Sequence, residues 1–106
     1  MIVIIETTTD ELKNAEKLSK LLIDKKLSPC IQISRDIKSF YNWKGKIDSS
    51  NEFLVKIKTI QNNCSKITEL IKKISNYEIP EIIMYKGEIL SNEYSTWFHE
   101  NINNNN

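Results

Sequence analysis

The order of strand-like and helix-like segments restricts the fold of this chain more than any other feature of its sequence. Residues 2–7 form a β-branched run that is typical of a buried strand. Apolar residues then recur with helical spacing in two stretches, separated by strand-like segments at 30–44 and 52–60. A further strand is predicted at 81–85. The helical positions are Leu12, Ala15, Leu18 and Leu22 in the first stretch and Ile67, Leu70, Ile71 and Ile74 in the second.

This order, β-α-β-β-α-β, predicts an α+β fold of the ferredoxin-like type, with an antiparallel sheet and both helices on one side of it. Ser91 or Asn92 can cap a short C-terminal helix, and residues 45–51 are predicted to form a turn region. We expect one domain over residues 1–102 and a disordered, asparagine-rich tail over 103–106. The apolar face of the last helix is formed by Tyr94, Trp97, Phe98 and Ile102.

Composition excludes several classes of protein. The 106 residues carry 15 basic and 14 acidic side chains, so the basic excess typical of a nucleic-acid-binding surface is missing. The apolar run at 1–5 is too short for a signal sequence or a membrane span. Two cysteines, Cys30 and Cys64, do not make a disulfide framework. We therefore expect a cytoplasmic protein without nucleic-acid or membrane partners.

The strand predicted at 30–44 is too long for a single compact domain. Its extended residues span roughly 50 Å at about 3.3 Å each, whereas a domain of this size measures only about 30–35 Å across. The far end carries Phe40, Tyr41 and Trp43, aromatic side chains that a solvated hairpin tip does not need. We therefore expect this strand to project and to associate with another copy of the chain. The alternative is a strand that kinks near Arg35 and folds back on its own core.

Side chains suited to metal binding or nucleophilic catalysis are few. His99 is the only histidine, the two cysteines are far apart in the sequence, and no Cys-x-x-Cys or His-x-x-x-His pattern occurs. Glycine-rich phosphate-binding loops and the G-x-S-x-G pattern are also missing. Nothing places a nucleophile beside His99, so we expect a protein without enzymatic activity.

The segment 76–83, NYEIPEII, places Glu78 and Glu81 on either side of Pro80, which allows two interpretations. Two carboxylates can work as an acid and a base when a closed pocket separates their pKa values. Alternatively, Pro80 holds the chain extended, so that the two glutamates point to opposite sides and the segment aims the next strand. We favour the structural interpretation, in which Tyr77 and Glu81 supply polar contacts at the start of that strand.

The same segment resembles the Tyr-Glu-x-Pro-Glu-Ile signature of the CutA family, the divalent-cation tolerance proteins. Four more stretches resemble that family in the same order, so the resemblance covers roughly residues 2–102. Glu6 stands where some members have a metal-associated cysteine, and residues 74–76 (ISN) stand where the family often has His-Pro or His-His-Pro before the tyrosine. The four stretches are LSPCI at 27–31, SFYNWKGKI at 39–47, IKT at 57–59 and YSTW at 94–97.

The resemblance implies a homotrimer in which the long hairpins of neighbouring subunits pair. It also implies a role in tolerance of divalent metal ions, with copper or another divalent cation as ligand and with Cys30 and Glu6 as candidate metal ligands. The trimeric plan also resembles that of the PII-type signalling proteins, so an alternative is binding of a small ligand in subunit clefts without a metal role. The residues expected at subunit interfaces or clefts are Tyr41, Trp43, Lys58, Tyr77, Glu81 and Trp97.

Two other classes of protein share this order of elements. An RNA-recognition module needs a Lys/Arg-Gly-aromatic pattern on its third strand, but residues 51–60 contain one aromatic residue and no glycine. A small phosphatase needs a phosphate-binding loop after the first strand, and Asp10 and Glu11 at that place oppose an anion. The sequence therefore favours neither class.

Overall fold

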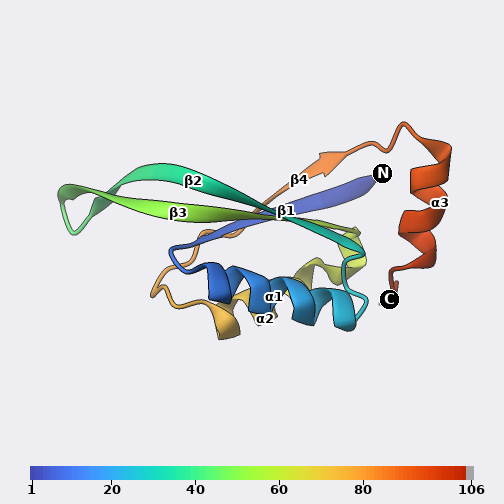
Figure 1. Cartoon of the computed structure of the whole chain (residues 1–106), viewed down its shortest axis with the longest axis horizontal. Coiled ribbons are helices and arrows are strands. Elements are labelled where there is room, and N and C mark those ends of the chain that lie inside the picture. The colour runs from blue at the N-terminus through green and yellow to red at the C-terminus, as the bar shows by residue number, and fades with distance from the viewer. Residues whose placement is uncertain (105–106) are drawn as a thin grey trace.

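Both predicted core helices lie against one face of a four-stranded antiparallel sheet (Figure 1). The computed structural model describes residues 1–104. Within them the strand order is β2-β3-β1-β4 and every neighbouring pair is antiparallel, so the predicted ferredoxin-like α+β fold is confirmed. The elements are β1 (Ile2–Thr9), α1 (Leu12–Asp24), β2 (Cys30–Trp43), β3 (Lys46–Thr59), a 3-10 turn (Gln61–Asn63), α2 (Cys64–Ile74), β4 (Ile83–Gly87) and α3 (Asn92–Glu100).

The main core lies between the sheet and the helices α1 and α2, because alternate residues of each strand point toward the helices. Val3 and Ile5 of β1 are buried there together with Val55 and Ile57 of β3. Six of the eight apolar residues whose spacing predicted the helices are buried there, whereas Leu12 and Ile74 are half-buried, so the periodicity in the sequence reflects one buried face per helix. The buried helix residues are Ala15, Leu18, Leu22, Ile67, Leu70 and Ile71.

Helix α3 packs on the other side of the sheet, at the end far from the hairpin tip (Figure 1). Its Phe98 is fully buried against Ile2 and Ile4 of β1. Ser91 caps this helix as predicted, since its hydroxyl accepts a hydrogen bond from the backbone N–H of Tyr94 at 3.2 Å. We call the sheet face turned away from α1 and α2 the open face; α3 covers one end of it.

Strands β2 and β3 form a hairpin with a tighter turn than the sequence indicated. The turn consists of Lys44 and Gly45, whose φ angles of +52° and +80° fit a two-residue type I′ turn. The predicted turn region at 45–51 is therefore wrong, because residues from Lys46 onward pair with β2. The polar side chains of that stretch indicated a loop, but the tight turn brings their backbone groups opposite β2, where pairing satisfies them.

The hairpin projects beyond the layer formed by α1 and α2, as the length of the predicted strand required (Figure 1). The molecule measures 46 × 26 × 22 Å along its principal axes. A bulge does interrupt β2 between Ser34 and Ile37, where Asp36 has a φ angle of +59°. The strand continues past the bulge, so the alternative of a strand that folds back on its own core is wrong.

Like the hairpin strands, β1 and β4 have bounds that differ from the prediction. β1 continues to Thr9, which pairs with Phe53 of β3. β4 begins at Ile83, two residues later than predicted, since Ile83 is the first residue that pairs with Glu6 of β1. Pro80 cannot donate a ladder hydrogen bond, which helps to delay the start of the strand.

The chain after α3 returns to the end of α1. The N–H of Asn103 donates a hydrogen bond to the carbonyl of Lys26 at 2.8 Å, and the Asn63 side chain donates to the carbonyl of Asn103 at 2.7 Å. Asn62 donates to the side chain of Asn104 at 2.5 Å. Hydrogen-bonded structure therefore extends two residues past the predicted domain end at 102, and positions 105–106 of the predicted tail lie outside the described residues.

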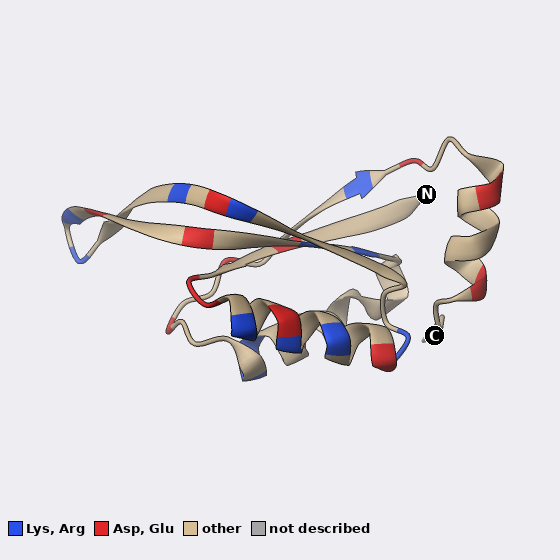
Figure 2. Ribbon diagram, viewed as in Figure 1, with Lys and Arg blue, Asp and Glu red and all other residues tan. Residues whose placement is uncertain are grey.

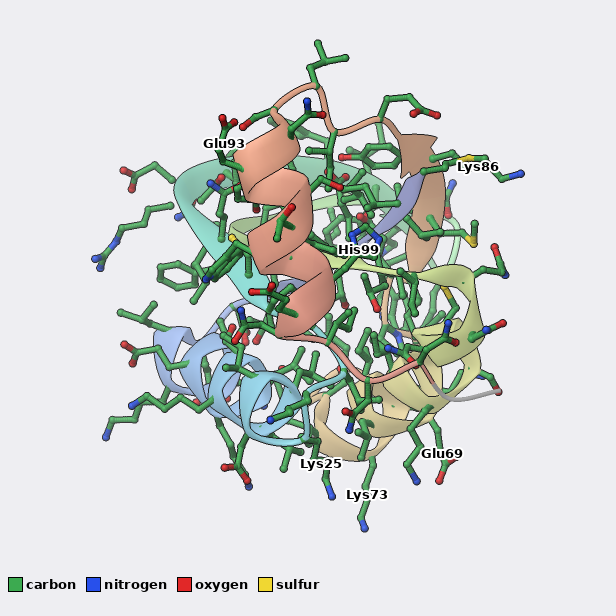
Figure 3. All side chains as sticks on the ribbon, turned by 90° about the vertical axis from the view of Figure 1, so that its right-hand side faces the viewer. Lys25, Glu69, Lys73, Lys86, Glu93 and His99 are labelled. Atoms are coloured by element: carbon green, nitrogen blue, oxygen red, sulfur yellow. The ribbon has the colours of Figure 1, made fainter. Side chains whose placement is uncertain are left out.

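Basic and acidic residues are interspersed over α1, α2 and the hairpin (Figure 2). Lys25, Glu69 and Lys73 point away from the two core helices, as expected for their solvent-facing side (Figure 3). Within residues 1–104, every helix is too short or too polar to cross a membrane.

Candidate functional site

A groove lies where the hairpin meets the segment between α2 and β4. Its volume is about 990 Å³, a size suited to small molecules. Residues 39–44 of the hairpin and residues 76–81 both line it. The fold thus brings four of the predicted interface or cleft residues, which lie far apart in the sequence, into one groove: Tyr41, Trp43, Tyr77 and Glu81.

The most buried carboxylate of this groove belongs to Glu52 of β3, whose exposed fraction is 7%. Ser39 Oγ donates a hydrogen bond to Glu52 Oε1 at 2.5 Å, and Tyr77 Oη donates to Glu52 Oε2 at 2.6 Å. The only ion pair among residues 1–104 joins Lys66 to Glu69, so Glu52 has neutral donors but no cationic partner in that part of the chain. Carboxylates buried to this degree are normally charge-paired.

Tyr77 joins the segment after α2 to the base of the hairpin. Burial raises the pKa of Tyr77 well above its usual value, and the hydrogen bond to Glu52 and the charges of nearby carboxylates raise it further. The phenol therefore stays protonated and remains a hydrogen-bond donor at neutral pH. Its ring and hydroxyl hold the groove-lining segment in place.

Asn76, the residue before Tyr77, ties the same segment to the loop between β1 and α1. Its Nδ2 donates to Asp10 Oδ1 at 2.6 Å and to Glu11 Oε1 at 3.1 Å, and its Oδ1 accepts from Thr9 Oγ1 at 3.1 Å. The last position of the stretch 74–76, where the family often has His-Pro or His-His-Pro, thus carries an amide with a structural role in this chain.

Glu78 and Glu81 both line the groove, but no hydrogen bond joins them to each other in the described part of the chain. The pKa of Glu81 is raised, first by burial and then by the negative charges of Glu52 and Glu6. The negative charges of Glu52 and Glu6 thus act on the Glu81 carboxylate. The geometry offers no closed pocket that would make Glu78 and Glu81 an acid/base pair.

A second cluster lies at the α3 end of the open face. Cys30 of β2 pairs directly with Lys58 of β3, so both side chains lie on one face of the sheet. The Lys58 ammonium is 5.6 Å from the centre of the Tyr94 ring, and the rings of Tyr94 and Trp97 are 5.5 Å apart. Three of the predicted residues, Cys30, Lys58 and Trp97, therefore meet here, separate from the groove.

The Tyr94 hydroxyl is the unusual polar group of this cluster. It is buried and has no hydrogen-bond partner among residues 1–104. Burial raises the pKa of Tyr94 to about 12, with a further contribution from the Cys30 thiol, which lies nearby without making a hydrogen bond of good geometry. Cys30 itself is half-buried and forms no disulfide within the described residues.

Glu6 occupies a place of its own on β1. It pairs with Lys56 on one side and with Ile83 on the other, and its Oε2 accepts a hydrogen bond from Tyr85 Oη at 2.6 Å. Cys30 lies two strands away in a different row of the sheet. No group of three or more His, Cys, Asp or Glu side chains within residues 1–104 could hold a metal ion. One subunit therefore does not bring the two predicted metal ligands together.

Sequence reasoning missed Glu52 and Ser39, and it assigned no role to the Tyr94 hydroxyl. The alternation of side chains along β3 indicated which way Glu52 points. Val55 and Ile57 face the core, so even-numbered residues such as Glu52 face the open side of the sheet. The hydrogen-bond donor Tyr77 is 25 positions away from Glu52 in the sequence, so the two residues meet only in the folded chain.

The fold and its overlong hairpin define a class of small ferredoxin-like proteins, and comparison with known families identifies which one. The family model described as "CutA1 divalent ion tolerance protein" matches residues 3–101. This chain therefore belongs to the CutA family.

Relatives and solved structures agree with this assignment. The "Divalent-cation tolerance protein CutA" of Archaeoglobus fulgidus is 33% identical over 95 residues, which cover 90% of this chain and 92% of that protein. The mouse "Protein CutA" is 32% identical over 88 residues, covering 83% of this chain and 50% of the mouse protein, so this chain spans about half of that relative.

Two solved structures superpose on almost the whole chain. The structure described as periplasmic divalent cation tolerance protein CutA from Archaeoglobus fulgidus has a TM-score of 0.91 and 32% identity, covering 97% of this chain and 100% of that one. The divalent cation tolerance protein from Thermus thermophilus has a TM-score of 0.90 and 27% identity, with the same coverage of both chains.

Proposed function

We propose that this protein acts as a homotrimer in tolerance of divalent metal ions, and that it binds copper or another divalent cation through ligands from more than one subunit. Membership of the CutA family carries this proposal, since its relatives are named for tolerance of divalent cations. Those names describe no catalysed reaction, and the proposal assigns none to this chain.

The hairpin supports the trimeric part of the proposal. It extends beyond the body of the subunit and exposes large apolar side chains near its tip, with Phe40 71% and Ile47 86% exposed. Apolar side chains on a projecting hairpin favour association over solvation. The outer edge of β4 is a second surface suited to a neighbour, because Met84 and Tyr85 are exposed there.

The open face supports the metal-binding part. Cys30 and Glu6 both face away from the α1–α2 layer, since each is in register with residues of the same parity on β3. Copies of these side chains from several subunits can supply the mixed thiolate–carboxylate set that one subunit lacks. Both cysteines are free thiols, which suits a reducing compartment such as the cytoplasm.

Sedimentation and calorimetry test this proposal. We expect a mass near three times 12.4 kDa in dilute solution, and saturable binding of Cu(I) or Cu(II) by the reduced protein. Cys30→Ser should abolish that binding, whereas Cys64→Ser, which removes the other thiol, should leave it intact. A monomer at micromolar concentration would contradict the assembly, and uptake that is weak and independent of Cys30 would contradict the metal site.

The groove favours a second candidate, binding of a small ligand as in the PII-type trimers. The observation behind it is the volume of about 990 Å³ lined by aromatic and charged side chains at the base of the hairpin. This candidate needs no metal, and it uses a part of the molecule remote from Cys30.

A further inference from the structure

We propose that the groove at the base of the hairpin binds an organic cation, a compound that carries an ammonium or guanidinium group on an apolar body. This inference rests on the small-ligand candidate above and names the chemistry of its ligand. Three features of the groove support it: its charge, the unpaired carboxylate within it and its aromatic lining.

The charge of the groove is strongly one-sided, although the chain as a whole is nearly neutral. Four carboxylates line it and only one ammonium, that of Lys44, stands against them. Burial raises the pKa of Glu81, and the negative charges of Glu52 and Glu6 raise it further. A cation entering the groove relieves that repulsion, whereas an anion adds to it. The four acids are Asp48, Glu52, Glu78 and Glu81.

Glu52 adds a specific reason for a positive group. It is more than nine-tenths buried, and its two oxygens accept hydrogen bonds from Ser39 and Tyr77, which are both neutral. Burial of an ionised carboxylate without a countercharge is unfavourable. No basic side chain among residues 1–104 forms an ion pair with Glu52, so within one chain this buried acid has no countercharge.

The aromatic lining suits an organic cation better than a bare metal ion. Tyr41, Trp43 and Tyr77 line the groove, and the Lys44 ammonium already lies 5.7 Å from the centre of the Trp43 ring. That distance lies within the range of a cation–π contact, so the Trp43 ring already has a positive charge beside it. The acids, by contrast, form no cluster of three that could chelate one metal ion in the described residues. Spaced carboxylates beside aromatic rings fit an extended amine.

Tryptophan fluorescence tests the inference directly, because the chain has two tryptophans and only Trp43 lines the groove. In a Trp97→Phe background, Trp43 is the single reporter. We expect spermidine to change its emission saturably and n-butylammonium to do so more weakly. The apparent affinity should fall as NaCl is raised, since salt screens the carboxylates.

Glu81→Gln provides the test of the site, because Glu81 is exposed and its replacement should not prevent folding. We expect the variant to bind spermidine about fivefold more weakly, the size of one exposed charge interaction. Glu88→Gln removes the same charge from the exposed chain just after β4 and outside the groove, and it should bind as the parent does.

Three results would overturn the inference. Equal weakening by Glu81→Gln and Glu88→Gln, or competition by Mg²⁺ at equal ionic strength, would show general charge attraction. Saturable binding of succinate in place of spermidine would retain the small-ligand candidate and reject a cation. No response to either probe, in protein whose mass and circular dichroism are unchanged, would reject both. The copper titration above is independent of all three results.

Discussion

The two ends of the open face each place a tyrosine hydroxyl among neighbouring strands, and they treat that hydroxyl differently. At the hairpin end, Tyr77 donates to the buried carboxylate of Glu52 at 2.6 Å. At the α3 end, the buried hydroxyl of Tyr94 has no hydrogen-bond partner within residues 1–104. A buried polar group without a partner costs about 1–3 kcal/mol. The hydrogen bonding of the hairpin end is thus satisfied within one chain, while that of the α3 end is not.

The two ends of the open face also differ in the sign of their charge. The groove at the hairpin end is dominated by carboxylates, and its buried acid lacks a countercharge. At the α3 end, the Lys58 ammonium lies over an aromatic ring beside the Cys30 thiol. The first end therefore attracts a positive group, whereas a metal ion approaching Cys30 must tolerate a lysine next to it. This difference is why we assign the organic cation and the metal ion to separate places.

The largest effect should come from removing the hydrogen bond between Tyr77 and Glu52 at the hairpin end. Tyr77→Phe keeps the ring but leaves the buried Glu52 carboxylate without one of its donors, so we expect a loss of about 1–3 kcal/mol in the free energy of unfolding. Denaturant titration at a fixed protein concentration measures this loss, because oligomer stability depends on concentration.

Tyr41→Phe is the matched control for that change. Its hydroxyl lies 3.5 Å from Ser50 Oγ on an exposed part of the hairpin, so its removal should change stability by no more than about 0.5 kcal/mol. Equal effects of the two substitutions would mean that the hydrogen bond to Glu52 does not stabilise the fold.

The sequence was sufficient to predict the fold because each element carried its own periodic signal. Leu18 and Ile67, for example, are buried where the helical spacing put them. The length of β2 likewise predicted that the hairpin projects, since that argument depends only on the rise per residue. These are local properties, and a single chain displays them directly.

The site was harder to predict because it depends on contacts between distant residues. Tyr77 and Glu81 were singled out from their segment, but nothing in the sequence of β3 distinguishes Glu52, the partner of Tyr77, from the other acid of that strand, Asp48. The burial of Glu52 arises only when the chain after α2 crosses the base of the hairpin. Similarly, no pattern in the sequence indicates that the Tyr94 hydroxyl lacks a partner.

A smaller effect on stability should come from the Glu81 carboxylate at the hairpin end, which is disfavoured by burial and by the charges of Glu52 and Glu6. The pKa of Glu81 is raised above its value of 4.5 in the unfolded chain, so the folded protein holds this proton more tightly. The corresponding stability is fully present below about pH 4.5 and is lost as the pH rises through the folded-state pKa. Glu81→Gln should therefore raise the melting temperature slightly at pH 7 and leave it unchanged near pH 3.

Melting curves of the parent and Glu81→Gln across that pH range measure the difference, with Glu88→Gln as the control for loss of net charge. A lower melting temperature for Glu81→Gln at pH 7 would show that the carboxylate is favourably paired instead of repelled by Glu52 and Glu6. It would also weaken the case for a groove dominated by negative charge.

The smallest effect on stability is expected from removing the Tyr94 hydroxyl at the α3 end, and the sign of that effect is informative. Tyr94→Phe removes a hydroxyl that has no partner in the described chain, so it takes away a desolvated group without breaking a hydrogen bond. We expect the free energy of unfolding to stay within about 0.5 kcal/mol of the parent or to rise. Denaturant titration at matched protein concentrations measures the change, and Tyr77→Phe serves as the contrasting loss. A loss of about 1 kcal/mol or more would mean that the hydroxyl is hydrogen-bonded in the assembled protein. Because the Tyr94 hydroxyl has no hydrogen-bond partner within residues 1–104, the acceptor would then come from a neighbouring subunit, a bound group or a closer approach of the Cys30 thiol.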